Sequence, residues 1–151
     1  MPDGGEQGHN ARNRQRGRDT DGNGEADRHE LFSNAFTQTA ETREFTTGLR
    51  AAPDGSFVLS KGGQQSATLG LHNGCVLRVS ADGSQARVLG WGLRMPFIGV
   101  HPVTGLVSAS DQEGNYVPAT PLHLIRQGRY HGFIPPFLPK DQHPEPIAEP
   151  L

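Results

Sequence analysis

Short apolar and β-branched runs alternate with polar positions through residues 48–134, and Gly, Pro and Asp interrupt them at regular intervals. Asp54-Gly55 and Asp82-Gly83 predict hairpin turns, because glycine reaches positive φ without a Cβ clash. A further turn is predicted over 102–105. The pattern predicts an all-β chain with strands at residues 56–60, 75–80, 86–90, 97–101, 106–110, 122–125 and 130–134.

The tripeptide Gly-Leu-Arg occurs at residues 48–50 and again at 92–94. This spacing falls in the range of about 40–45 residues that one four-stranded propeller blade occupies. With a short strand added before each first turn, the units 48–91 and 92–134 each have four strands. We therefore predict a partial β-propeller of about two blades plus flanking pieces. Since closed propellers have about four to eight blades, we expect a fragment with an exposed blade face.

The segments that flank the predicted blades differ from them in composition. Residues 1–18 are rich in Arg and almost free of apolar side chains, which predicts disorder. Residues 135–151 are rich in Pro and are expected to form an extended link towards a missing blade. The net charge of −2 does not indicate a nucleic-acid or membrane partner, and neither a signal peptide nor a transmembrane stretch is visible. A single cysteine, Cys75, excludes an internal disulfide and is expected to be buried as a small apolar residue.

The most specific local chemistry lies in residues 19–30, DTDGNGEADRHE. Oxygen-bearing side chains occupy positions 1, 3, 5, 9 and 12 of a calcium-binding loop, with a glycine at position 6 and a backbone carbonyl at position 7. Residues 10–18 have no apolar face for an entering helix, so we expect a loop between β elements with a structural role. A metal-free acidic turn is the alternative. The predicted calcium ligands are Asp19, Asp21, Asn23, Glu25, Asp27 and Glu30.

Residues 19–151 resemble the six-bladed propeller of the glucose/sorbosone dehydrogenase-like family, in the branch of large bacterial membrane-bound or haem-binding dehydrogenases. The resemblance rests on DTDGNGEAD, GLRMPFIGVHP, SDQEGNYVPATP and GRYHGFIPP. It implies calcium-assisted hydride transfer from a sugar or alcohol hydroxyl to pyrroloquinoline quinone in a periplasmic or extracellular parent protein, with a cytochrome c as electron acceptor. It also implies a catalytic and cofactor-binding role for Arg94, and cofactor contacts from Asp111, Gln112, Glu113 and Gly114.

The chain departs from the family pattern in two respects. Met95 stands where the family commonly has Asn, and the blade that carries the general-base histidine lies outside the matched region, so no base is assigned and the chain alone is expected to be inactive. The alternative role of Arg94 and Arg50 is structural: their guanidinium groups would donate hydrogen bonds to backbone carbonyls between blades. The alternative function is a non-catalytic, calcium-stabilised propeller that binds carbohydrate or protein.

Three histidines and the tryptophan receive structural predictions. We expect His101 to cap the turn that follows it, and His123 and His131 to pack in strands with one satisfied nitrogen each. Trp91 is expected to pack between the two blades.

Overall fold

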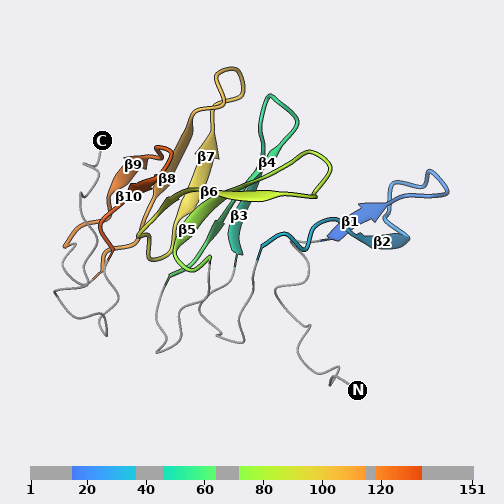
Figure 1. Cartoon of the computed structure of the whole chain (residues 1–151). Helices are drawn as coiled ribbons and strands as arrows, with labels where there is room; N and C mark the ends of the chain where they lie inside the picture. The colour runs from blue at the N-terminus through green and yellow to red at the C-terminus, as the bar shows by residue number, and fades with distance from the viewer. Residues whose placement is uncertain (1–14, 37–45, 64–71, 115–117, 134–151) are drawn as a thin grey trace.

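The computed structural model describes residues 15–36, 46–63, 72–114 and 118–133 (Figure 1). These residues form three β-sheets and no helix, and none of the sheets closes on itself. The all-β prediction is confirmed. Residues 1–14 of the predicted disordered terminus and the whole of the predicted Pro-rich link, 135–151, lie outside the described residues.

The largest sheet contains the first predicted unit. Strands β3 (Thr46–Ala51), β4 (Phe57–Lys61), β5 (Cys75–Val79) and β6 (Ala86–Trp91) form an antiparallel meander in sequence order. Gly55 and Gly83 have φ of 81° and 76° in the turns between strands. Both predicted Asp-Gly turns are therefore confirmed, and the strands lie within one residue of their predicted bounds.

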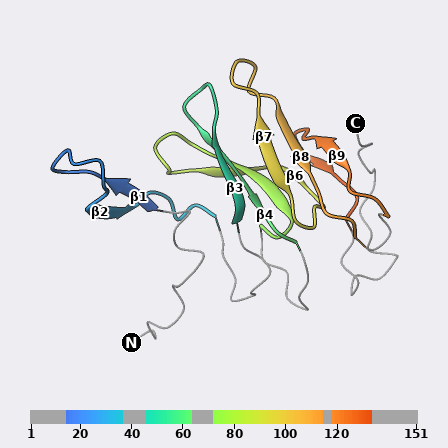
Figure 2. The same cartoon turned by 180° about the vertical axis from the view of Figure 1, so that it is seen from behind.

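The second sheet is a three-stranded antiparallel meander of β7 (Phe97–Val100), β8 (Val107–Ser110) and β9 (Leu122–Leu124). Its first strand lies beside β3 of the large sheet. A Cβ added to Gly48 would meet Ile98 Cγ1 at 3.2 Å. The two meanders thus pack against each other through their first strands (Figures 1 and 2).

The prediction of a fourth strand in the second unit is wrong. Strand β10 (Arg129–Tyr130) pairs in parallel with β6, at the edge of the first sheet. The amides of His131 and Phe133 continue this pairing, donating to the carbonyls of Trp91 and Gly92 over 2.8 Å each. The segment returns to the first sheet because the edge of β6 offers it unpaired carbonyls.

The two Gly-Leu-Arg copies occupy different places in the fold. The first lies within β3, whereas the second forms the connection from β6 to β7. Gly92 has a φ of 79° there, and a Cβ would stand 2.2 Å from the ring of Tyr130. The Arg50 guanidinium donates to the carbonyl of the adjacent Leu49 over 2.8 Å. The prediction that Arg50 links two blades is therefore wrong.

The core lies on both faces of β4 and β5, since alternate residues of a strand point to opposite faces. One cluster, between the two meanders, contains Ala52, Val58, Val76, Leu89, Leu93, Ile98, Val107 and Ala109. The other contains Phe36, Leu59, Cys75, Leu77 and Val79. The burial of Cys75 is confirmed. The face of the large sheet that points away from the second meander is covered in part by Phe36, beside a cavity of about 160 Å³.

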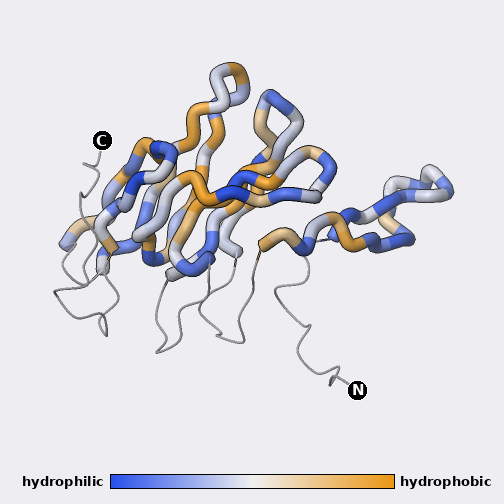
Figure 3. Tube along the Cα trace, viewed as in Figure 1, coloured by the Kyte–Doolittle hydropathy of each residue, from blue (hydrophilic) through white to orange (hydrophobic). Residues whose placement is uncertain are grey.

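A separate hairpin of β1 (Gln15–Arg18) and β2 (Arg28–Leu31) projects away from the meanders (Figures 1 and 2). Figure 3 shows that it is mostly hydrophilic, in contrast to the strands of the large sheet. The carboxylate of Glu30 pairs with Arg18 at 2.8 Å and with Arg28 at 3.2 Å. Residues 15–18, the last of the segment predicted to be disordered, are thus part of a strand. In the part of the chain that is described, no helix has the length and apolar character needed to cross a membrane.

Candidate functional site

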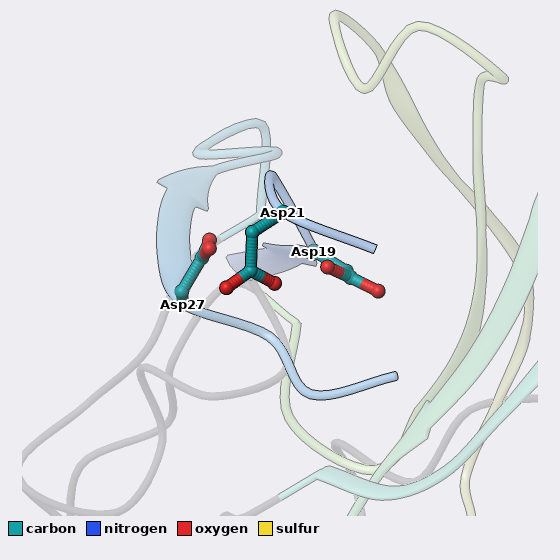
Figure 4. A group of neighbouring side chains, drawn as sticks. All are labelled: Asp19, Asp21 and Asp27. Atoms are coloured by element: carbon teal, nitrogen blue, oxygen red, sulfur yellow. The ribbon is translucent and has the colours of Figure 1, made fainter. Parts of the chain in front are cut away.

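The tip of the β1–β2 hairpin brings three aspartates together (Figure 4). Carboxylate oxygens of Asp19, Asp21 and Asp27 lie within 4.8 Å of one another, and all three residues are exposed. The loop connects two strands, as predicted. Calcium takes six to eight oxygen ligands, so this group could supply part of a coordination shell.

Hydrogen bonds within the loop hold these carboxylates in place. Asp19 accepts the amides of Gly22 at 2.6 Å and Gly24 at 2.9 Å, and these bonds lower the pKa of Asp19 below its ordinary value. Asp27 accepts both the amide and the hydroxyl of Thr20. The same geometry serves a metal-free acidic turn, because the acceptors already have partners.

Among the described residues, neither Glu25 nor Glu30 adds its carboxylate to this group. Glu30 is engaged with Arg18 and Arg28, since it continues as a strand residue where the calcium-loop template would begin a helix. Asn23 donates to Asp21 at 3.2 Å and accepts the amide of Glu25 at 2.7 Å. The structure therefore brings three of the six predicted ligands together through their carboxylates, and Asn23 is hydrogen-bonded to one of them, Asp21. The predicted role of the Glu25 carbonyl stays a prediction.

A second group of polar residues lies where the β6–β7 connection meets the end of β8. Asp111 is 4% exposed, and its carboxylate accepts the amides of Arg94 (2.8 Å), Met95 (2.7 Å) and Gln112 (2.9 Å). Burial raises the pKa of Asp111, against the opposing effect of these three bonds and of His123. The side chain of Asp111 thus ties the connection to the strand end.

The residues that the family resemblance singled out lie together at this place. The Arg94 guanidinium donates to the carbonyl of Glu113. A Cβ on Gly114 would stand 3.4 Å from Arg94 Cδ, which shows how closely the two segments approach. Gln112 and Glu113 are exposed, whereas Asp111 is buried. Arg94 and 111–114 therefore form one surface with a buried carboxylate beneath it.

Two buried histidines extend this group into the interior. His123 and His131 are 2% and 3% exposed, and their ring centres lie 5.0 Å apart with planes at 66°. Within the described ranges, neither ring has a protein hydrogen-bond partner on either nitrogen. Burial lowers the pKa of both residues, that of His131 to about 4, while Asp111 counteracts the shift in His123. The partner that was predicted for one nitrogen of each ring is therefore not a protein group of the described residues. We call Arg94, Asp111, His123 and His131 the junction cluster.

Sequence patterns could not identify this histidine pair, because the two residues lie in segments that pair with different sheets. His123 lies opposite Ala109 in β9, and His131 follows β10. His101 behaves as predicted, since its Nδ1 accepts the amides of Val103 and Thr104. Trp91 does not pack between the two meanders as predicted. It is 39% exposed, and its ring centre lies 6.5 Å from that of Tyr130.

Together with the exposed Gln112 and Glu113, Arg94 of the junction cluster presents a guanidinium, an amide and a carboxylate on one surface. Such a set of groups is suited to binding anions or hydroxyl groups. Comparison of the chain with models of protein families, with curated proteins and with solved structures found no match in any of the three.

Proposed function

We propose that the chain forms part of the propeller of a quinoprotein-like sugar or alcohol dehydrogenase that acts in the periplasm or outside the cell. The observation that carries this proposal is the convergence of Arg94 with 111–114 at one end of two adjacent meanders. The family resemblance places the cofactor beside these same residues. Pyrroloquinoline quinone, when bound, accepts a hydride from the substrate hydroxyl.

The residues of this surface have distinct roles in the proposal. Arg94 is oriented through Glu113 and has further N–H groups for an oxygen that carries negative charge. Asp111 positions the backbone of the β6–β7 connection and does not contact the substrate. Gln112 and Glu113 are exposed and can orient hydroxyl groups. Met95 adds no polar group to this surface. The planar anionic quinone therefore fits Arg94, while the base and the remaining contacts come from other blades, with a cytochrome c taking up the electrons.

We also propose that Asp19, Asp21 and Asp27 bind calcium with a structural role, stabilising the hairpin by offsetting the repulsion between three carboxylates. Calorimetric titration of Ca²⁺ should give one site in the wild type and none in an Asp19→Ala, Asp21→Ala double variant. Asp82→Ala, in a different exposed turn, is the control and should leave the titration unchanged. Equal heats in the wild type and the double variant would show that the loop is a metal-free turn.

A second candidate function is a non-catalytic platform that binds carbohydrate or protein. It is favoured by the bonds of Asp111 and Arg94, because both oxygens of Asp111 accept backbone amides and Arg94 is bonded to a backbone carbonyl. Such bonds also occur in purely structural repeats.

The two functions differ in how the parent protein responds to quinone. The dehydrogenase predicts heat on titration with pyrroloquinoline quinone and dye-linked oxidation of a sugar. Arg94→Lys should then lower turnover by about 10²–10³-fold, the usual loss for a group that stabilises developing charge. Arg50→Lys is the matched control and should retain activity. Carbohydrate binding without quinone binding or turnover would favour the platform and refute the enzyme.

A further inference from the structure

The histidine pair of the junction cluster poses a problem of hydrogen bonding. A neutral imidazole has one donor and one acceptor nitrogen, and buried polar groups nearly always have partners. All four ring nitrogens of His123 and His131 lack one among the described residues. Native structures keep such groups where a water or an ion satisfies them.

The two rings approach each other from different sheets. His123 lies in β9 of the second meander, and His131 lies against β6 of the first. A Cβ on Gly90 would stand 2.8 Å from Nε2 of His131, so this glycine lets the ring pack directly on the strand. The imidazoles therefore meet at the junction of the two meanders, where a shared ligand would link them.

The charge at this place favours a cation. Asp111 is buried and interacts electrostatically with His123. Among the described residues it forms no ion pair with a lysine or arginine side chain, and its stabilising contacts are three backbone amides. A buried carboxylate is normally paired or lies near a metal.

We propose that His123 and His131 jointly bind one divalent transition-metal ion of the Zn²⁺ type between the two meanders, with Asp111 balancing its charge. The separation of the rings agrees with this arrangement. An ion about 2.1 Å from one nitrogen of each imidazole, in tetrahedral geometry, places the ring centres about 5 Å apart. The two rings are 5.0 Å apart here, in an edge-to-face arrangement with planes at 66°. The remaining coordination positions take water or an external ligand.

The donor atoms of the pair suit a transition metal, because a metal ion binds the unprotonated nitrogen of an imidazole. Metal selectivity follows from the donor atoms, since imidazole suits Zn²⁺, Ni²⁺ and Cu²⁺ better than Ca²⁺. This site is therefore separate from the acidic loop of the hairpin and does not depend on quinone binding.

The first test is a Zn²⁺ titration of the metal-free chain by calorimetry, in buffer that contains Ca²⁺ to occupy the acidic loop. We expect one equivalent to bind, and His123→Gln and His131→Gln each to weaken that binding at least about tenfold, because each removes one of two protein ligands. His29→Gln, which removes an exposed imidazole on β2, is the control and should leave the affinity unchanged. Equal affinity in all four proteins would overturn the proposal and assign the heat to surface sites.

A second test uses the wild type alone, so that it remains decisive if a variant fails to fold. The imidazole nitrogen resonances of ¹⁵N-histidine-labelled protein should shift for both buried rings when one equivalent of Zn²⁺ is added. Trp91 provides a fluorescence readout, because its carbonyl accepts the amide of His131 and it is the only tryptophan of the chain. Ni²⁺ should quench it stoichiometrically. Unchanged resonances of the buried rings would show that water, and not a metal, satisfies the pair.

Discussion

Replacing His131 with Phe should abolish much of the loss of stability that acid causes in this protein. Burial lowers the pKa of His131 to about 4, from an ordinary value of 6.5. Between these two values the unfolded chain binds a proton that the folded chain excludes. The free energy of unfolding therefore falls as the pH falls from 6.5 towards 4. Above pH 6.5 the neutral His131 causes no such loss of stability.

The size of the effect follows from the same two pKa values. Between pH 7 and pH 5, His131 should lower the free energy of unfolding by about 1–2 kcal/mol, once solvent screening of part of the shift is allowed for. His131→Phe keeps a planar ring of similar shape against Gly90 and loses no hydrogen bond to the described protein groups. At pH 7 the variant should be at least as stable as the wild type, because a buried polar ring without partners is costly.

The assay is urea unfolding followed by circular dichroism at pH 7 and at pH 5, with a chelator present so that metal binding does not contribute. The quantity to compare is the change in the free energy of unfolding between pH 7 and pH 5, measured in the wild type and in His131→Phe. His29→Gln, an exposed site, should retain the full wild-type dependence. Equal pH dependence in the wild type and His131→Phe would refute the argument, since it would mean that His131 is protonated as readily in the folded chain as in the unfolded one.

Three further predictions concern stability. Asp111→Asn should lower the free energy of unfolding by about 2–3 kcal/mol, because the amide group cannot accept all three backbone N–H bonds; chemical unfolding at pH 7 measures this, and an unchanged midpoint would contradict it. Phe36→Ala should cost about 3–5 kcal/mol by opening a cavity in the second core cluster, whereas Phe97→Ala, at a position 61% exposed, should cost far less; equal thermal shifts would be inconsistent with the described packing. Gly83→Ala should lower stability by about 2 kcal/mol or more, since φ is +76° and the Cβ would stand 2.1 Å from the carbonyl of Phe32; a neutral effect in the same unfolding assay would exclude this close approach.

Local patterns in the sequence predicted the strands well. The alternation in β4 and β5 and the Asp-Gly turns depend on consecutive residues, because strand periodicity and positive φ are properties of short segments. The acidic loop of the hairpin was predicted on the same grounds, from oxygen donors at fixed spacing. The Gly-Leu-Arg repeat did not mark equivalent positions, because its first copy lies within β3 and its second copy lies in the connection from β6 to β7.

The amino-acid sequence by itself determined that this is an all-β chain, where its turns lie and where its acidic loop begins. Tertiary structure alone decided which distant segments meet. Strand β10 pairs with β6, and Glu30 forms ion pairs with two arginines. Asp111 is buried, and His123 lies beside His131. The physical reason is that conformation follows from neighbouring residues, whereas the partners of an edge strand, a buried carboxylate or an imidazole depend on which surfaces pack together.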